Sequence, residues 1–273
     1  MNFRTDSDSF GEIKIPSDKF YGASTQRAVD NFPFSNRRLP EGMIRALGLI
    51  KWASALANQE LKKLDPKLAK GVATAALEVV QGKHDDQFPV DIFQTGSGTS
   101  SNMNANEVIA NLANVALGEK LGSKKPVHPN DHVNMGQSSN DLIPAAIHLA
   151  AALGLQEKLI PALKILQNSL GKKSAEFKEV IKIGRTHLQD ATPVTLGQEF
   201  SGYAAQIKKA IRRMEMALED LTELAIGGTA VGTGINTQAQ FASKVGVAIH
   251  VTAIGVCLVV TGHKIRWKNN VNY

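Results

Sequence analysis

The sequence has little cysteine and few aromatic residues, and both shortages restrict what the protein can be. Cys257 is the only cysteine, so no disulfide can form within the chain, and a reducing compartment is the simplest interpretation. Aromatic residues make up 5% of the chain, too few to provide a platform for stacking nucleic-acid bases. Basic residues are interleaved with acidic ones, so the net charge of +6 favours small anions over nucleic acid.

Long apolar runs and targeting segments are also missing. An apolar run at residues 245–260 is interrupted by His250 and Thr252, and it is shorter than the ~20 residues that a helix needs to cross a bilayer. No secretory signal and no transit segment rich in Arg and Ser is visible in the sequence. We therefore expect no membrane span, and a protein of the cytoplasm or the mitochondrial matrix.

The residues that are plentiful favour helices, since Ala, Leu, Lys and Gln lose little conformational freedom on entering one. Apolar residues at helical spacing predict helices over residues 43–61, 67–81, 104–117, 141–170 and 195–226. Residues 1–40 are rich in Gly, Pro, Asp and Ser and predict an extended arm with a short hairpin. The predicted fold is mainly all-α, with an N-terminal helical domain followed by a bundle of long helices.

Four segments rich in Gly, Ser, Thr and Asn adjoin the predicted helices, at residues 96–102, 128–132, 137–140 and 184–187. A helix N-terminus offers unpaired N–H groups and about half a positive charge, and nearby hydroxyls and amides add neutral donors. Several such ends that converge would bind a small molecule with two carboxylates. One segment alone is more often a set of helix caps, and His187 alone is more often structural, so the prediction depends on the four together.

Other motifs carry less weight. The glycines at 96 and 98 lack the third glycine of a dinucleotide fingerprint, and no clear strand precedes them. The glycine-rich turn near residue 230 is followed by Thr233 rather than by the lysine of a P-loop. His128, Asp131 and His132 match no standard spacing of metal ligands, so we expect no metal.

At the four polar segments the sequence resembles the class II fumarases of the aspartase/fumarase superfamily. The similarity extends from about residue 3 to about residue 245. It is carried by residues 94–106 (QTGSGTSSNMNAN), 127–141 (VHPNDHVNMGQSSND), 184–202 (GRTHLQDATPVTLGQEFSG) and 227–237 (GGTAVGTGINT). Ser139 and His187 favour fumarase, because aspartases typically have Thr and Gln at these positions. Aspartate ammonia-lyase is therefore the lesser alternative.

This resemblance implies a fumarate hydratase, which reversibly hydrates fumarate to L-malate in the tricarboxylic acid cycle without a metal or cofactor. It implies that His187 is the catalytic histidine. It also implies that substrate is bound by Ser97, Thr99, Ser138, Ser139, Asn140 and Thr186, and that a second dicarboxylate site is formed by His128, Asn130 and Asp131. In this family the segments of one site come from different subunits of a homotetramer, whose long helices form a common core.

The chemistry of that reaction suits such a set of donors. Removing a proton from the carbon next to a carboxylate gives an aci-carboxylate with extra negative charge. Donors held in advance must stabilise that charge more than they stabilise the ground state.

Beyond about residue 245 the resemblance ends. The resemblance over the rest of the chain implies an N-terminal lyase domain at residues 1–135 and part of a central helical bundle at 136–245. Residues 246–273 are then a non-homologous tail. The family's Gly-Ser-Ser-Ile-Met-Pro loop, whose serine is the proposed base, has no counterpart in this sequence. We therefore expect weak activity or none from this chain alone. The alternative is a non-catalytic fragment that binds dicarboxylate or pairs with full-length subunits.

Overall fold

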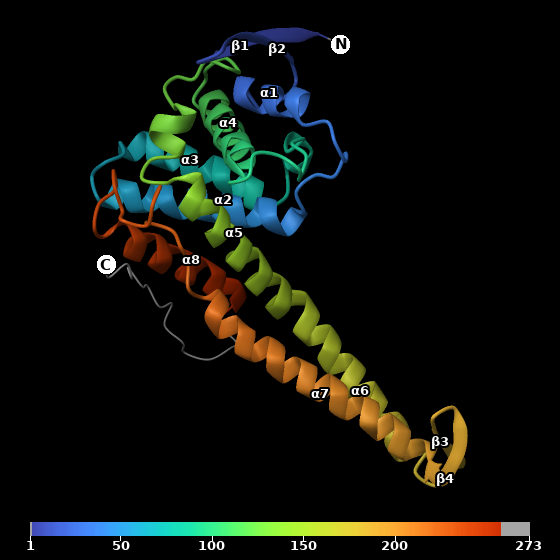
Figure 1. The fold of residues 1–273 in the computed structure, drawn as a ribbon. Helices are drawn as coiled ribbons and strands as arrows, with labels where there is room; N and C mark the ends of the chain where they lie inside the picture. The colour runs from blue at the N-terminus through green and yellow to red at the C-terminus, as the bar shows by residue number, and fades with distance from the viewer. Residues whose placement is uncertain (1, 258–273) are drawn as a thin grey trace. The chain divides into compact units, whose positions relative to one another are not determined.

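The computed structural model describes the backbone of residues 2–257 and the side chains of residues 2–249. The chain forms two compact units. Of the described residues, the first unit contains 2–150 and 223–257, and the second contains 151–222. Each unit is built mainly from helices, which confirms the predicted fold class (Figure 1). The family-based domain limits at residues 135 and 245 stay a prediction.

The first unit begins with a hairpin and continues with helices. Its elements are β1 (Phe3–Asp8), β2 (Gly11–Pro16), α1 (Ala23–Asn31), α2 (Glu41–Glu60), α3 (Pro66–Val80), η1 (Asp85–Gln87), α4 (Thr99–Ala116), η2 (Pro129–Val133), most of α5 (Ser139–Gly154) and α8 (Phe241–Cys257). The hairpin β1–β2 is antiparallel, as the sequence predicts. Helix α1 is an addition to the prediction, which treated residues 1–40 as an extended arm.

The core of the first unit lies between α2, α3, α4 and α8. Helix α2 packs against α3 and α8, and α3 packs against α4 (Figure 1). Leu47, Ile50, Val72 and Ile109 are fully buried there. Each such side chain contributes about 1.5–3 kcal/mol through removal of apolar surface from water.

Buried asparagines of α4 hold the loops around this core. Asn111 donates from Nδ2 to the carbonyl of Phe20, at 2.6 Å. Asn114 donates from Nδ2 to the carbonyl of Val127 at 2.8 Å and accepts at Oδ1 from the N–H of Val127 at 2.8 Å. An unpaired buried backbone group costs about as much free energy as a lost hydrogen bond. These side-chain amides therefore stabilise the loops by pairing backbone groups that form no bonds within a helix or sheet.

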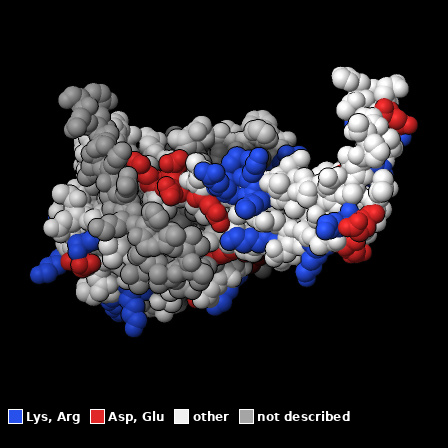
Figure 2. Space-filling view, turned by 90° about the horizontal axis from the view of Figure 1, so that it is seen from below, with Lys and Arg blue, Asp and Glu red and all other residues white. Residues whose placement is uncertain are grey.

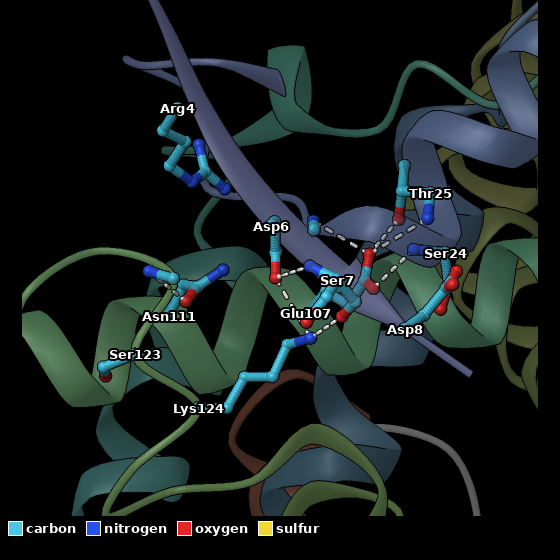
Figure 3. Close-up of polar contacts among 12 residues, drawn as sticks. Arg4, Asp6, Ser7, Asp8, Ser24, Thr25, Glu107, Asn111, Ser123 and Lys124 are labelled. Atoms are coloured by element: carbon cyan, nitrogen blue, oxygen red, sulfur yellow. Dashed lines mark hydrogen bonds and ion pairs between the residues drawn. The ribbon is translucent and has the colours of Figure 1, made fainter. Parts of the chain in front are cut away.

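A buried carboxylate of α4 stabilises the start of α1 (Figure 3). Glu107 accepts hydrogen bonds from the N–H groups of Gly22, Ser24 and Thr25 at 2.8, 2.9 and 3.1 Å. The hydroxyl of Thr25 adds a fourth bond at 2.6 Å. A Cβ atom on Gly22 would lie 2.7 Å from Cδ of Glu107, so only glycine leaves room for the carboxylate. Burial raises the pKa of Glu107, and the four donors oppose that rise.

The second unit is a pair of helices with a hairpin. Its elements are η3 (Leu155–Leu159), α6 (Ile160–Glu176), β3 (Ile181–Thr186), β4 (Gln189–Thr195) and α7 (Leu196–Leu221). Helices α6 and α7 run side by side, with β3 and β4 at one end of the pair (Figure 1). Helix α5, η3 and α6 follow one another without a gap, as the predicted long helix over residues 141–170 requires.

The start of α7 is fixed by a capping box. The N–H of Gln198 donates to Oγ1 of Thr195 at 3.1 Å, and the N–H of Thr195 donates to Oε1 of Gln198 at 2.9 Å. This reciprocal pair satisfies two of the N–H groups that a helix start leaves unpaired. The helix therefore begins within one residue of the predicted position.

Acidic and basic side chains lie next to one another on the surface. The second unit carries the ion pairs Lys164–Glu215, Lys173–Glu176 and Lys182–Glu199, at 3.5, 2.7 and 2.5 Å. On the face seen in Figure 2, both signs of charge are present among the described residues. Over residues 2–257, no helix combines the length and the apolar character needed to cross a membrane.

Candidate active site

Two helix N-termini meet at Thr99 and Ser139. Thr99 is the first residue of α4 and Ser139 is the first residue of α5. Oγ1 of Thr99 lies 2.6 Å from Oγ of Ser139. The backbone dipoles of each helix contribute partial positive charge at its start, so the meeting point of the two starts attracts an anion.

The start of α4 is held by side chains that precede it. The N–H of Ser101 donates to Oε1 of Gln94 at 2.9 Å, and Nε2 of Gln94 donates to Oγ of Ser101 at 2.7 Å. Gly98 has φ 68°, and a Cβ atom there would lie 3.1 Å from Cγ1 of Ile143 on α5. The predicted start at residue 104 was therefore wrong, because Gln94 extends α4 back to Thr99.

The start of α5 is held by a glycine-rich turn from much later in the sequence. Oδ1 of Asp141 accepts from the N–H of Ser138 at 2.9 Å, and Oδ2 accepts from the N–H groups of Gly227 and Thr229 at 2.9 and 2.8 Å. Burial raises the pKa of Asp141, while these three donors and the charge of Lys51 oppose the rise. The turn therefore fixes Asp141 and, through it, Ser138, the residue before Ser139.

The other predicted ligands of the first unit lie within two residues of Thr99 or Ser139 in the sequence. Ser97 is exposed in the turn before α4. Oγ of Ser138 accepts from the N–H of Asn140 at 3.3 Å. Asn140 is exposed, and its Nδ2 donates to the carbonyl of Ala230 at 2.7 Å. The structure therefore brings Thr99 and Ser139 into contact, with Ser138 and Asn140 adjacent to Ser139 in the sequence.

The segment that contains Thr186 and His187 is not at a helix start, which corrects the sequence prediction. Thr186 ends β3 and pairs with Gln189 of β4, so His187 and Leu188 form the two-residue turn of a hairpin. Their φ angles are 49° and 60°. Two consecutive positive φ angles match the type I′ turn that suits the twist of paired strands.

Thr186 and His187 are both exposed. They belong to the second unit, whereas Thr99 and Ser139 belong to the first. That Thr186 and His187 form one dicarboxylate site with Thr99 and Ser139 stays a prediction.

The predicted second site lies on η2 and just before it. Nδ1 of His128 lies 3.2 Å from Oδ2 of Asp131, and the N–H of His128 donates to Nδ1 of His132 at 2.8 Å. Asn130 is exposed. Burial lowers the pKa of His132. Among the described residues, no group of three His, Cys, Asp or Glu side chains is placed to hold a metal ion.

Three residues that lie near Ser139 were not identified from the sequence. They are Lys51, Asn102 and Asn134, and Lys51 contacts both amides. The signal for Lys51 was present: it occupies a position of the predicted helix 43–61 where the neighbouring turns place Leu47 and Ser54, both buried. Asn102 and Asn134 gave no separate signal within their polar segments.

Comparison with known proteins gives a family match over most of the chain. The model of the lyase family matches residues 11–265. This match includes part of residues 246–273. The predicted boundary of the tail at residue 245 stays a prediction, and residues 258–273 lie outside the described part of the chain.

Relatives at high identity carry one name. The class II fumarate hydratase of Methylorubrum extorquens is 56% identical over 241 residues, which are 88% of this chain and 51% of that protein. The one from Halobacterium salinarum is 55% identical over 240 residues, again 88% of this chain and 51% of that protein. The chain thus spans about half the length of the curated relatives it matches.

Solved structures agree with these relatives. A class II fumarase from Schistosoma mansoni superposes with a TM-score of 0.89 at 40% identity, over 96% of this chain and 56% of that one. A fumarate lyase:delta crystallin from Brucella melitensis, bound to cobalt, gives 0.88 at 42% identity, over 96% and 57%. The chain therefore belongs to the lyase family, among the class II fumarases of the aspartase/fumarase superfamily.

Proposed function

We propose that this chain supplies part of the dicarboxylate site of an enzyme that reversibly hydrates fumarate to L-malate. The observation that carries the proposal is the 2.6 Å contact between the hydroxyls of Thr99 and Ser139, at two converging helix N-termini. The names of the relatives support the choice of reaction.

In this proposal one substrate carboxylate lies at the meeting point of α4 and α5. One hydroxyl of the Thr99–Ser139 pair donates to its oxygens, helped by the partial positive charge of both helix starts. When the neighbouring carbon loses its proton, the carboxylate gains negative charge and this fixed donor binds it more strongly. Stabilisation that grows along the reaction in this way raises the rate as well as the affinity.

The other predicted residues complete the proposal. Ser97, Ser138, Asn140 and Thr186 are further substrate ligands, and His187 moves the proton or activates the water. His128, Asn130 and Asp131 form the second dicarboxylate site. The enzyme works as a homotetramer without a metal or cofactor, and since the curated relatives above are bacterial or archaeal, the cytoplasm is the favoured compartment.

Binding and turnover measured on the purified chain test the proposal. We expect fumarate and L-malate to bind in a calorimetric titration, and any hydration of fumarate, followed by absorbance, to be lost in His187→Ala. Binding without turnover favours the non-catalytic alternative. Release of ammonia from L-aspartate favours an ammonia-lyase. Absence of binding by fumarate and by L-malate contradicts the proposal.

A further inference from the structure

Lys51 is fully buried in α2, which is unusual for lysine because removing its charge from water is costly. Its Nζ donates to Oδ1 of Asn102 at 2.8 Å and to Oδ1 of Asn134 at 2.9 Å. Burial lowers the pKa of Lys51 well below its usual value, and the charge of Asp141 opposes that effect. An apolar side chain would fill the same volume without the cost of desolvating an amine. Packing alone therefore does not explain a lysine at this position.

The contacts of Lys51 lead to the Thr99–Ser139 pair. Nδ2 of Asn102 donates to Oγ of Ser139 at 3.3 Å and to Oδ1 of Asn134 at 3.2 Å. Because Nζ of lysine donates to its neighbours, Asn102 must turn its oxygen toward Lys51. The opposite side of the same amide, which carries the N–H groups, then points at Ser139.

This orientation decides where the hydroxyl protons go. Oγ of Ser139 uses one lone pair to accept from Asn102, and one proton is shared across the 2.6 Å contact with Thr99. Whichever hydroxyl donates across that contact, the other keeps its proton free for an anion. Without the donor from Asn102, Ser139 could instead turn its own proton inward, toward the amide.

We propose that Lys51 is a positioning residue of the dicarboxylate site. Through Asn102 it fixes the direction in which Ser139 and Thr99 present a hydroxyl proton. The inference rests on the proposed function, because it takes a dicarboxylate as the anion. It assigns a role to a residue that touches neither substrate nor reacting atoms.

The first test compares two buried substitutions on the same helix. Lys51→Met keeps the approximate length of the side chain and removes its hydrogen-bond donors. Asn58→Leu is the matched control: Asn58 is buried two turns further along α2, and its Nδ2 donates to the carbonyl of Met135 at 3.0 Å. Fumarate affinity is measured by calorimetry, and stability by urea unfolding, for both variants and the wild type.

We expect both variants to lose stability, but only Lys51→Met to weaken fumarate binding by the folded protein, by about 10-fold or more. Equal dissociation constants for Lys51→Met and Asn58→Leu would show that Lys51 is structural and would overturn the inference, while the proposed function would stand. A wild-type chain that binds neither fumarate nor L-malate refutes the proposed function, and the inference with it.

Two further measurements protect the test from a variant that does not fold. Asn102→Asp places a carboxylate against Lys51 and removes the donor to Ser139, so we expect a folded protein that binds fumarate about 10-fold more weakly or worse. A crystal structure of whichever variant folds, determined without substrate, shows how the side chains of residue 102 and Ser139 are arranged. In Lys51→Met we expect the side chain of Asn102 to leave its position between Asn134 and Ser139, and an unchanged position overturns the inference.

Discussion

The N–H of Thr229 donates to the carboxylate of Asp141 at 2.8 Å, and this bond joins the first turn of α5 to a turn 88 residues later. Asp141→Asn replaces an acceptor oxygen by an NH2 group that faces backbone donors. We expect the free energy of unfolding to fall by about 1–3 kcal/mol, because at least one buried N–H loses its partner. Urea unfolding measures the change.

The control for that change is Glu60→Gln. Glu60 is exposed and forms an ion pair with Lys244, and such surface pairs contribute about 0–1 kcal/mol. We expect little change in this variant. If Asp141→Asn proves as stable as Glu60→Gln, the turn is not held by the carboxylate.

The contact between Thr99 and Ser139 predicts that the two hydroxyls act together. Thr99→Val and Ser139→Ala should each weaken fumarate binding about 10-fold, because each breaks the hydroxyl pair that presents a proton to a charged group. The double variant should lose less than the sum of the two, with a coupling of about 0.5–3 kcal/mol. Calorimetric titration of the four proteins measures it, with Ser169→Ala on α6 as a control that should bind normally. Strict additivity would argue against a shared site.

The positive φ angle of Leu188 predicts how substitutions at this position rank in the stability of the hairpin. Leu188 is 96% exposed, and its φ of 60° costs a side-chain-bearing residue about 1–2 kcal/mol. We expect Leu188→Asn and Leu188→Gly to protect the hairpin amides from hydrogen exchange at least as well as the wild type. Leu188→Val should protect them least, since a β-branched residue tolerates positive φ worst. The reverse order would mean that residues 187 and 188 do not form this turn.

Glu107 predicts a dependence of stability on pH. Burial raises the pKa of Glu107 in the folded state above its unfolded value of about 4.3. At a pH between these two values, the native protein holds a proton on Glu107 that the unfolded protein has released. Proton uptake by the native state makes the unfolding free energy rise as pH falls through this range. Glu107→Gln lacks this contribution, although it loses part of the cap on α1.

Urea unfolding of both proteins between about pH 7 and pH 4 checks this sign. The difference in unfolding free energy, wild type minus Glu107→Gln, should grow as pH falls. A difference that shrinks would show that the four donors outweigh burial and hold the pKa of Glu107 low.

Elements with a local cause were predictable from the sequence. Asp65 caps α3 through the N–H groups of Lys67 and Leu68, beside a proline in the first turn, as the sequence indicates. Helix α1 was missed because no side chain near its own start caps it. Its donors are satisfied by Glu107, more than 80 residues later, and no local pattern shows such a partner.

The same distinction applies to the candidate site. Ser139 at a helix start followed from local pattern, whereas its contact with Thr99 depends on how α4 and α5 pack. The hairpin β3–β4 was missed because its two-residue turn, His187 and Leu188, contains no glycine. Lys51 shows its role only when the packing brings Asn102 beside it.

Helix α4 connects the two predicted anion sites through one rigid element. It begins at Thr99, and its Asn114 holds both backbone polar groups of Val127, the residue before His128. About 22 Å of helix separate Thr99 from Asn114 at ~1.5 Å per residue. A displacement of α4 as a whole would carry both sites with it. One residue inserted between them would turn one end by about 100° relative to the other, so the length of this helix sets the spacing and orientation of the two sites.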